Sequence, residues 1–142
     1  MPSLDTIADR DQRRHAKLQL ENPDGVRFTM EVEFHVNRVT TEHVEVDIAP
    51  YFEEGETEDD LDESEIAAIR NAVGFCDMVP VWDLSGPLKN RAGETVIERD
   101  QPIPMEPRYV RLVPLWLTNA ITQKLLEIVN PNRTSSRRSR KR

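Results

Sequence analysis

The chain has 142 residues, of which 37% are hydrophobic and 32% are charged, and its net charge is −7. This length suits one domain with a compact core, and no apolar run reaches the roughly 20 residues that span a bilayer. The single cysteine, Cys76, excludes an internal disulfide, and the first residues lack a secretory signal, so we expect a protein of a reducing cytoplasm.

The charge is divided unevenly along the chain. Residues 133–142 hold six basic side chains and no acid, so the part before them is strongly acidic. An acidic body favours solubility and repulsion between copies, and a basic tail can contact an anionic surface. We expect residues 1–13 to be a flexible N-terminus and residues 130–142 to be a disordered basic tail.

Residues 16–48 carry the clearest strand signals. The turn sequence Asn22-Pro23-Asp24-Gly25 follows a short strand-like segment, and from Val26 to Asn37 apolar and polar residues alternate strictly. Alternation of this kind is typical of a half-buried strand, and the turn suits a hairpin. A weaker alternation at residues 44–48 predicts a third strand, which would complete an antiparallel meander with one apolar face.

An acidic segment follows the strands. Residues 53–65 contain nine acids and no base, and their spacing does not match a calcium-binding loop. We therefore interpret the segment as a solvated, mobile connector. A helix is predicted to start near Asp62 or Ser64, because Ile66, Ile69 and Val73 recur at helical spacing, and to stop at Gly74.

The last third of the chain predicts extended segments followed by helices. Residues 79–84 suit a short edge strand, and a small hairpin is predicted around residues 91–93. Pro107 and Pro114 suit the first positions of a short and a longer helix. The predicted fold is therefore α+β: an N-terminal antiparallel β-meander or hairpin, an acidic connector, and a C-terminal helical unit with a disordered basic tail, with one domain over residues 14–129.

No catalytic, cofactor-binding or metal-binding constellation emerges from the residues. His35 and His43 could approach each other on the polar face of the predicted hairpin, but no ligand spacing supports zinc or nickel there. Cys76 has no histidine near it in sequence and suits a small core residue. We therefore expect a protein that is not an enzyme and needs no cofactor.

The longer C-terminal helix has one apolar face. Tryptophan is enriched at protein interfaces, and an apolar helix face can bind a partner helix. We predict a partner-binding strip, with the reservation that burial of these side chains within one subunit would place the binding surface elsewhere; Trp82 and Trp116 could instead pack together as core. The residues of the predicted strip are Trp82, Trp116, Leu117, Ile121, Leu125 and Ile128.

The order of segments in residues 78–135 carries a family resemblance. It consists of Trp82-Asp83-Leu84, a glycine-bearing loop, Ile103-Pro104, a short helix, and Val113 to Leu117 opening an amphipathic helix. This order resembles the tail assembly chaperones of long-tailed bacteriophages. The loop between Leu84 and Pro102 is longer than in that pattern, and residues 16–48 have no counterpart in it.

The resemblance implies a non-enzymatic protein of the host cytoplasm. Such chaperones bind the tape-measure protein transiently, help to recruit tail tube subunits during virion morphogenesis, and are commonly absent from the mature virion. Two alternatives stay open: a structural minor tail or connector protein, and a small nucleic-acid-binding regulator that uses the basic tail. The tail has no interleaved aromatic residues, so we do not expect nucleic acid as the main partner. A homo-oligomer is compatible with all of these readings.

Overall fold

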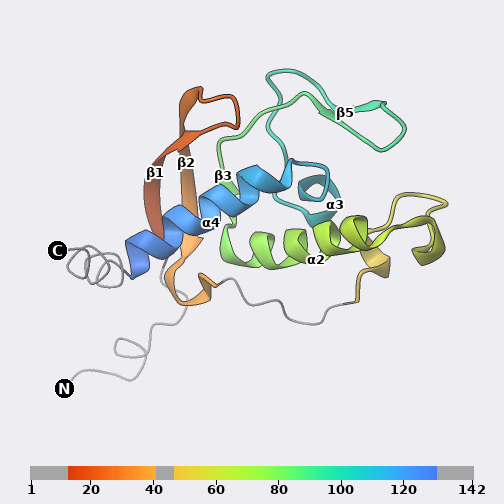
Figure 1. Ribbon diagram of the computed structural model, residues 1–142, viewed down its shortest axis with the longest axis horizontal. Helices are drawn as coiled ribbons and strands as arrows, with labels where there is room; N and C mark the ends of the chain where they lie inside the picture. The colour runs from red at the N-terminus through yellow and green to blue at the C-terminus, as the bar shows by residue number, and fades with distance from the viewer. Residues whose placement is uncertain (1–12, 41–46, 131–142) are drawn as a thin grey trace.

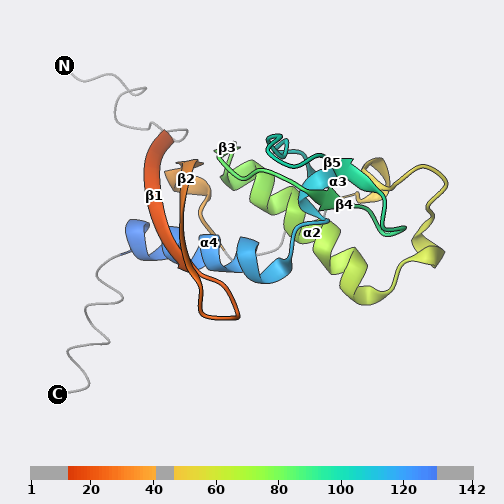
Figure 2. The same ribbon diagram turned by 90° about the horizontal axis from the view of Figure 1, so that it is seen from above.

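The computed structural model describes residues 13–40 and 47–130. It has the predicted α+β architecture, with an antiparallel sheet near the N-terminus followed by helices (Figure 1). The sheet lies at one end of the molecule, a small second hairpin lies at the other, and two long helices connect the ends (Figures 1 and 2).

The predicted N-terminal hairpin is confirmed. Strands β1 (Arg13–Glu21) and β2 (Arg27–His35) pair antiparallel along their full length. In the turn, Gly25 has a φ of +85°, a left-handed conformation that a side chain would strain. The Asn22 side chain accepts hydrogen bonds from the N–H groups of Asp24 and Val26, so its carboxamide holds the turn closed.

The third strand of the sheet differs from the prediction. Strand β3 (Val81–Trp82) pairs with β2 on the edge opposite β1, so the sheet order is β1-β2-β3. Ile48, from the predicted third strand, instead packs with Leu61 and Ile69 in a second apolar cluster. Residues 44–46 lie outside the described part of the chain. Alternation alone did not reveal that β3 would take the place beside β2.

Helix α2 (Glu63–Met78) starts where predicted and ends later. The Asp62 side chain accepts the Glu65 N–H at 2.8 Å, which caps the first turn. Gly74 does not end the helix: the buried stripe continues through Phe75 to Met78, so packing outweighs the weak helix propensity of glycine.

Two helices form the C-terminal unit. Helix α3 (Pro107–Val110) is short, and α4 (Leu115–Val129) lies across one face of the β1–β2 hairpin (Figures 1 and 2). The Asn71 side chain of α2 donates to the buried Thr118 hydroxyl at 3.1 Å, which links the two long helices. The main core is formed by apolar side chains of the sheet, α2, α3, α4 and the loops between them.

The remaining elements are short. Strands β4 (Leu88–Lys89) and β5 (Thr95–Ile97) form the predicted small hairpin, and Gly93 in its turn has a φ of +83°. Three 3-10 helices, η1 (Val36–Arg38), η2 (Ala49–Tyr51) and η3 (Glu58–Asp60), lie on the route from β2 to α2. In the residues that the structure describes, no helix combines the length and the apolarity needed to cross a membrane.

Candidate functional site

Most of the predicted partner-binding strip is buried inside the subunit. Trp82, Leu117, Ile121 and Leu125 are at most 8% exposed. The apolar face of α4 packs onto the protein's own sheet and α2, so these four side chains form core. The expectation that they make an exposed contact strip is therefore wrong, and only the half-buried Trp116 and Ile128 retain surface.

The two tryptophans do not share one aromatic cluster. The Trp82 ring lies 5.6 Å from the Phe75 ring, centroid to centroid, and its Nε1–H donates to the Ile103 carbonyl at 2.8 Å. The Trp116 ring meets Phe28 edge to face, with 6.2 Å between centroids. Trp82 thus fixes the loop before α3 onto the core, whereas Trp116 joins α4 to β2 near the surface.

A groove lies beside the Phe28–Trp116 pair. It has a volume of about 580 Å³ and runs between the turn end of the hairpin and the flank of α4 next to the buried face. On α4 the lining side chains recur at helical spacing, from Ala120 to Glu127, and this stripe continues from Trp116. The lining residues are Gln19, Leu20, Glu21, Arg27, Phe28, Thr29, Ala120, Gln123, Lys124 and Glu127.

Two exposed apolar side chains flank the aromatic pair in sequence. Val26 is 59% exposed and lies two residues before Phe28, and Leu115 is 50% exposed and lies directly before Trp116. Large apolar side chains with this exposure are costly to hydrate when they lie close together. We define the hairpin–α4 surface as Val26, Phe28, Leu115, Trp116 and the groove residues.

The charges around the groove balance one another. Glu21 and Glu127 supply two carboxylates, and Arg27 and Lys124 supply two cations. A partner in this groove would therefore gain from apolar contact at its aromatic end and from mixed ion pairs along its length, with no strong preference for one sign of charge.

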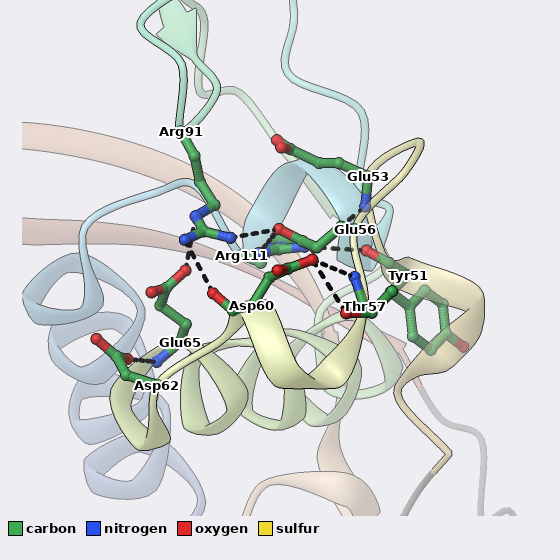
Figure 3. A network of polar contacts seen from close by, with 9 residues as sticks. All are labelled: Tyr51, Glu53, Glu56, Thr57, Asp60, Asp62, Glu65, Arg91 and Arg111. Carbon is green, nitrogen blue, oxygen red and sulfur yellow. Dashed lines mark hydrogen bonds and ion pairs between the residues drawn. The ribbon is translucent and has the colours of Figure 1, made fainter.

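An ion-pair network that was not predicted lies at the other end of the molecule. Arg111 lies 2.6 Å from Glu56, and both side chains are at most 5% exposed. Arg91 lies 2.7 Å from both Glu56 and Glu65, so it bridges the two carboxylates (Figure 3). The Arg111 guanidinium also donates to the Tyr51 carbonyl at 3.3 Å.

Glu56 stays ionised because of its donors. Burial opposes the charged form, but hydrogen bonds from Arg111, Arg91 and the Glu53 N–H outweigh burial and lower the pKa of Glu56 to about 2. The hydrogen bond to Glu56 in turn raises the pKa of Arg91. Each carboxylate of the network, Glu56 and Glu65, lies 2.7 Å or less from an arginine nitrogen, so the charges compensate one another.

The network corrects part of the interpretation of residues 53–65 as a solvated, mobile connector. Most of the segment is exposed, as expected, but the Glu56 side chain is buried. Glu56 and Glu65 are held by arginines, and η3 is closed by a reciprocal capping box between Thr57 and Asp60. A signal for the network was present in the sequence: Arg111 stands between Val110 and Leu112 in an apolar stretch. An arginine in such a stretch needs a carboxylate when it is buried.

The other candidate groups form no cluster with each other. His35 is half-buried, His43 lies outside the described residues, and no group of three or more His, Cys, Asp or Glu in residues 13–40 and 47–130 is placed to hold a metal ion. Cys76 packs against the core, and burial together with the nearby Glu106 raises the pKa of its thiol to about 12. The basic tail lies outside the described residues.

Comparison of the chain with models of protein families, with curated proteins and with solved structures found no match.

Proposed function

We propose that this protein is a bacteriophage tail assembly chaperone that binds the tape-measure protein transiently and assists the recruitment of tail tube subunits, without an enzymatic step. The observation that carries the proposal is the hairpin–α4 surface: a groove beside an aromatic pair, with the exposed Val26 and Leu115 close to that pair in sequence. A surface of this shape suits an amphipathic helix of an unfinished client.

The residues behind the family resemblance belong to one connected unit, which is compatible with the proposal. The Trp82 indole donates to Ile103, and the Ile103 N–H donates to Leu84, so the Trp-Asp-Leu segment and the Ile-Pro segment hold each other. Asp83 accepts the Glu31 N–H and thereby fixes the unit to the sheet. Trp82 and Ile103 also belong to the main core, to which α4 and β2 contribute.

The test is co-expression of the chain with the tape-measure protein encoded in the same genome. Wild-type chain is expected to raise the soluble fraction of the tape-measure protein and to co-purify with it. Val26→Glu and Leu115→Glu should each reduce co-purification about tenfold, because each places a carboxylate within an apolar contact. Both positions are at least half exposed, so folding should be preserved.

Val96→Glu is the matched control. Val96 is 39% exposed and lies on β5, at the opposite end of the molecule, so its substitution should leave co-purification unchanged. Equal binding by wild type and both surface variants would contradict the hairpin–α4 surface as the contact. A tape-measure protein that is equally soluble without the chain would contradict the chaperone role.

The protein content of purified particles distinguishes a chaperone from a structural protein of the virion. A chaperone is expected to be missing from purified particles or present in traces, whereas a minor tail or connector protein is present in fixed stoichiometry. Quantitative mass spectrometry of purified particles measures this directly, and stoichiometric presence would overturn the proposal.

A further inference from the structure

Strand β1 forms one margin of the sheet. Among the residues that the structure describes, β2 is the strand that pairs with β1, and the sheet order β1-β2-β3 leaves the far side of β1 without a strand. An edge of nine residues exposes a row of backbone donors and acceptors that another strand can use.

The hairpin turn fixes which backbone groups point outward. The Asn22 N–H donates to the Val26 carbonyl at 2.9 Å, so these residues form a hydrogen-bonded pair. Such pairs alternate along an antiparallel ladder, and Leu20 with Phe28 is the next one. The β1 residues that alternate with the hydrogen-bonded ones therefore direct their backbone N–H and C=O groups away from β2. These outward residues are Arg13, His15, Lys17, Gln19 and Glu21.

The pairing of β2 with β3 supports this assignment of outward-pointing backbone groups. Glu31 is opposite Lys17, and by the same alternation its backbone points away from β1. Its carbonyl accepts the Asp83 N–H at 3.2 Å and its N–H donates to the Asp83 carboxylate at 3.0 Å, both on the β3 side. The assignment of outward groups on β1 follows the same ladder.

The edge is self-complementary in charge when two copies run antiparallel. With Lys17 opposite Lys17 of the second copy, Arg13 comes opposite Glu21, and this pair occurs twice because of the two-fold axis. Cross-strand pairs of opposite charge stabilise a sheet, and the like pair at Lys17 opposes it with long, exposed side chains. Two attractive pairs against one repulsive pair favour this register.

The core side of β1 is buried near the turn and exposed toward Arg13, so a second copy could bury the exposed part. On the core side of β1, Leu18 and Leu20 are buried, whereas Ala16 is half-buried and Arg14 is exposed. The C-terminal end of α4 reaches past β1 (Figures 1 and 2). If two β1 strands ran antiparallel, this end of α4 would face the Arg14 end of the neighbouring strand. Glu127, a groove residue, belongs to this last part of α4.

We propose that the chain forms a homodimer in which the outer edges of two β1 strands pair antiparallel about Lys17, joining two sheets into one. The outward N–H and C=O groups of the five outward residues make the new ladder. The overhanging end of each α4 packs on the other copy. The dimer shares Gln19, Glu21 and Glu127 with the hairpin–α4 surface but uses none of Val26, Phe28, Leu115 and Trp116. The inference does not require the chaperone function, because it rests on the sheet edge.

Sedimentation velocity of the full chain at concentrations up to about 100 µM tests the dimer. Wild type should dimerise, and Lys17→Pro should be a folded monomer, because proline removes an outward N–H on an edge strand and leaves the β1–β2 ladder intact. Lys17→Thr should tighten the dimer about threefold, since it removes the like-charged pair.

Charge reversal gives a second measurement that does not depend on proline. Arg13→Glu should weaken the dimer about tenfold, because two cross-strand pairs change from opposite to like charge. The double variant Arg13→Glu with Glu21→Arg should restore wild-type affinity by exchanging the two signs. A melting temperature within a few degrees of wild type, as expected for an exposed substitution, shows that each variant is folded.

Three results would overturn the proposal. One is a wild-type chain that is monomeric throughout the concentration range. Another is a dimer that Lys17→Pro and Arg13→Glu leave unchanged, since its interface would lie elsewhere. The third is protection of the His15 and Gln19 amides from hydrogen exchange that depends on a bound tape-measure protein and not on chain concentration, which would assign the edge to that partner.

Discussion

Glu56 is a carboxylate that the fold surrounds with donors while removing its water. Its side chain is 5% exposed, and it accepts hydrogen bonds from Arg111, from Arg91 and from the N–H of Glu53. Arg111, 3% exposed, has Glu56 as its carboxylate partner. A buried pair of this kind contributes little net stability compared with apolar residues, but removing one partner leaves a buried charge and is costly.

The depressed pKa of Glu56 predicts a loss of stability in acid. In the unfolded chain the pKa is near 4.5 and in the folded chain it is about 2. Because the folded value is the lower one, the contribution is complete above pH 4.5 and is lost as the pH falls toward 2. Linkage gives about 3 kcal/mol for this shift. Urea unfolding followed by tryptophan fluorescence between pH 2 and pH 6 measures the change.

Glu56→Gln isolates this contribution. It should lower the free energy of unfolding at neutral pH by about 3 kcal/mol, since Arg111 loses its charged partner, and should flatten the acid dependence. Glu58→Gln, at an exposed position of the same acidic segment, is the control and should keep the wild-type slope. An unchanged slope in Glu56→Gln would mean that other carboxylates control acid unfolding.

At the scale of elements, the sequence predicted the helices and strands correctly where residues close together in the chain determine the structure. Alternation from Val26 onward and the turn at Asn22 identified the hairpin, and Asp62 identified the start of α2, because each of these signals acts within a few residues. The prediction that α2 ends at Gly74 was wrong, because tertiary packing of Phe75 and Met78 outweighs the low helix propensity of glycine.

The candidate site was harder to predict for a physical reason. An apolar stripe on α4 has the same spacing whether it packs on its own sheet or on a partner, so Ile121 and Leu125 could not be assigned from periodicity. The groove joins β1, β2 and α4, and the ion pair joins Glu56 to Arg111 across 55 positions. Such contacts leave no local pattern in the sequence. Arg111, which stands in an apolar stretch, indicates that a carboxylate partner is needed, but it does not identify Glu56 as that partner.

The loop between β3 and β4 depends on a close backbone approach at Gly86. A Cβ placed there would lie 2.5 Å from the Glu98 carbonyl oxygen and 2.8 Å from that of Ile97. Both obstacles are backbone atoms, so the loop must shift to admit a side chain. Gly86→Ala should therefore lower the free energy of unfolding by about 2 kcal/mol, as measured by urea unfolding.

Gly74→Ala is the matched control for Gly86→Ala. A Cβ on Gly74 meets no atom within 4 Å, and the residue lies inside α2. Alanine there should raise the free energy of unfolding by about 0.5–1 kcal/mol, because it reduces the freedom of the unfolded chain. If both variants shifted stability in the same direction, steric crowding at Gly86 would not explain the result.

At the scale of the whole molecule, two apolar clusters share helix α2. The main core joins the sheet, α2, α3 and α4, whereas the smaller cluster consists of Ile48, Leu61 and Ile69 with neighbouring half-buried side chains. The ion-pair network lies beside the smaller cluster and ties residues 51–65 to the β4–β5 hairpin and to Arg111 (Figure 3). Small clusters with few contacts open more easily than a main core.

This division predicts two levels of stability within one chain. Ile121 is fully buried in the main core, and Ile121→Ala should lower the global free energy of unfolding by about 3 kcal/mol or more, through lost burial and a cavity. Leu61→Ala removes a side chain of the smaller cluster, so its main effect should be local opening. It should speed hydrogen exchange at the amides of residues 52 and 61, which close η2 and η3 by donating to Ala49 and Glu58.

Native-state hydrogen exchange separates these outcomes residue by residue. In Leu61→Ala the amides of Ile121 and Leu125 in α4 should exchange at nearly wild-type rates, because α4 contributes no side chain to the smaller cluster. In Ile121→Ala protection should fall throughout the main core. Equal loss of protection in α4 for both variants would show a single cooperative unit, in which the network couples the connector so tightly to the core that neither opens alone.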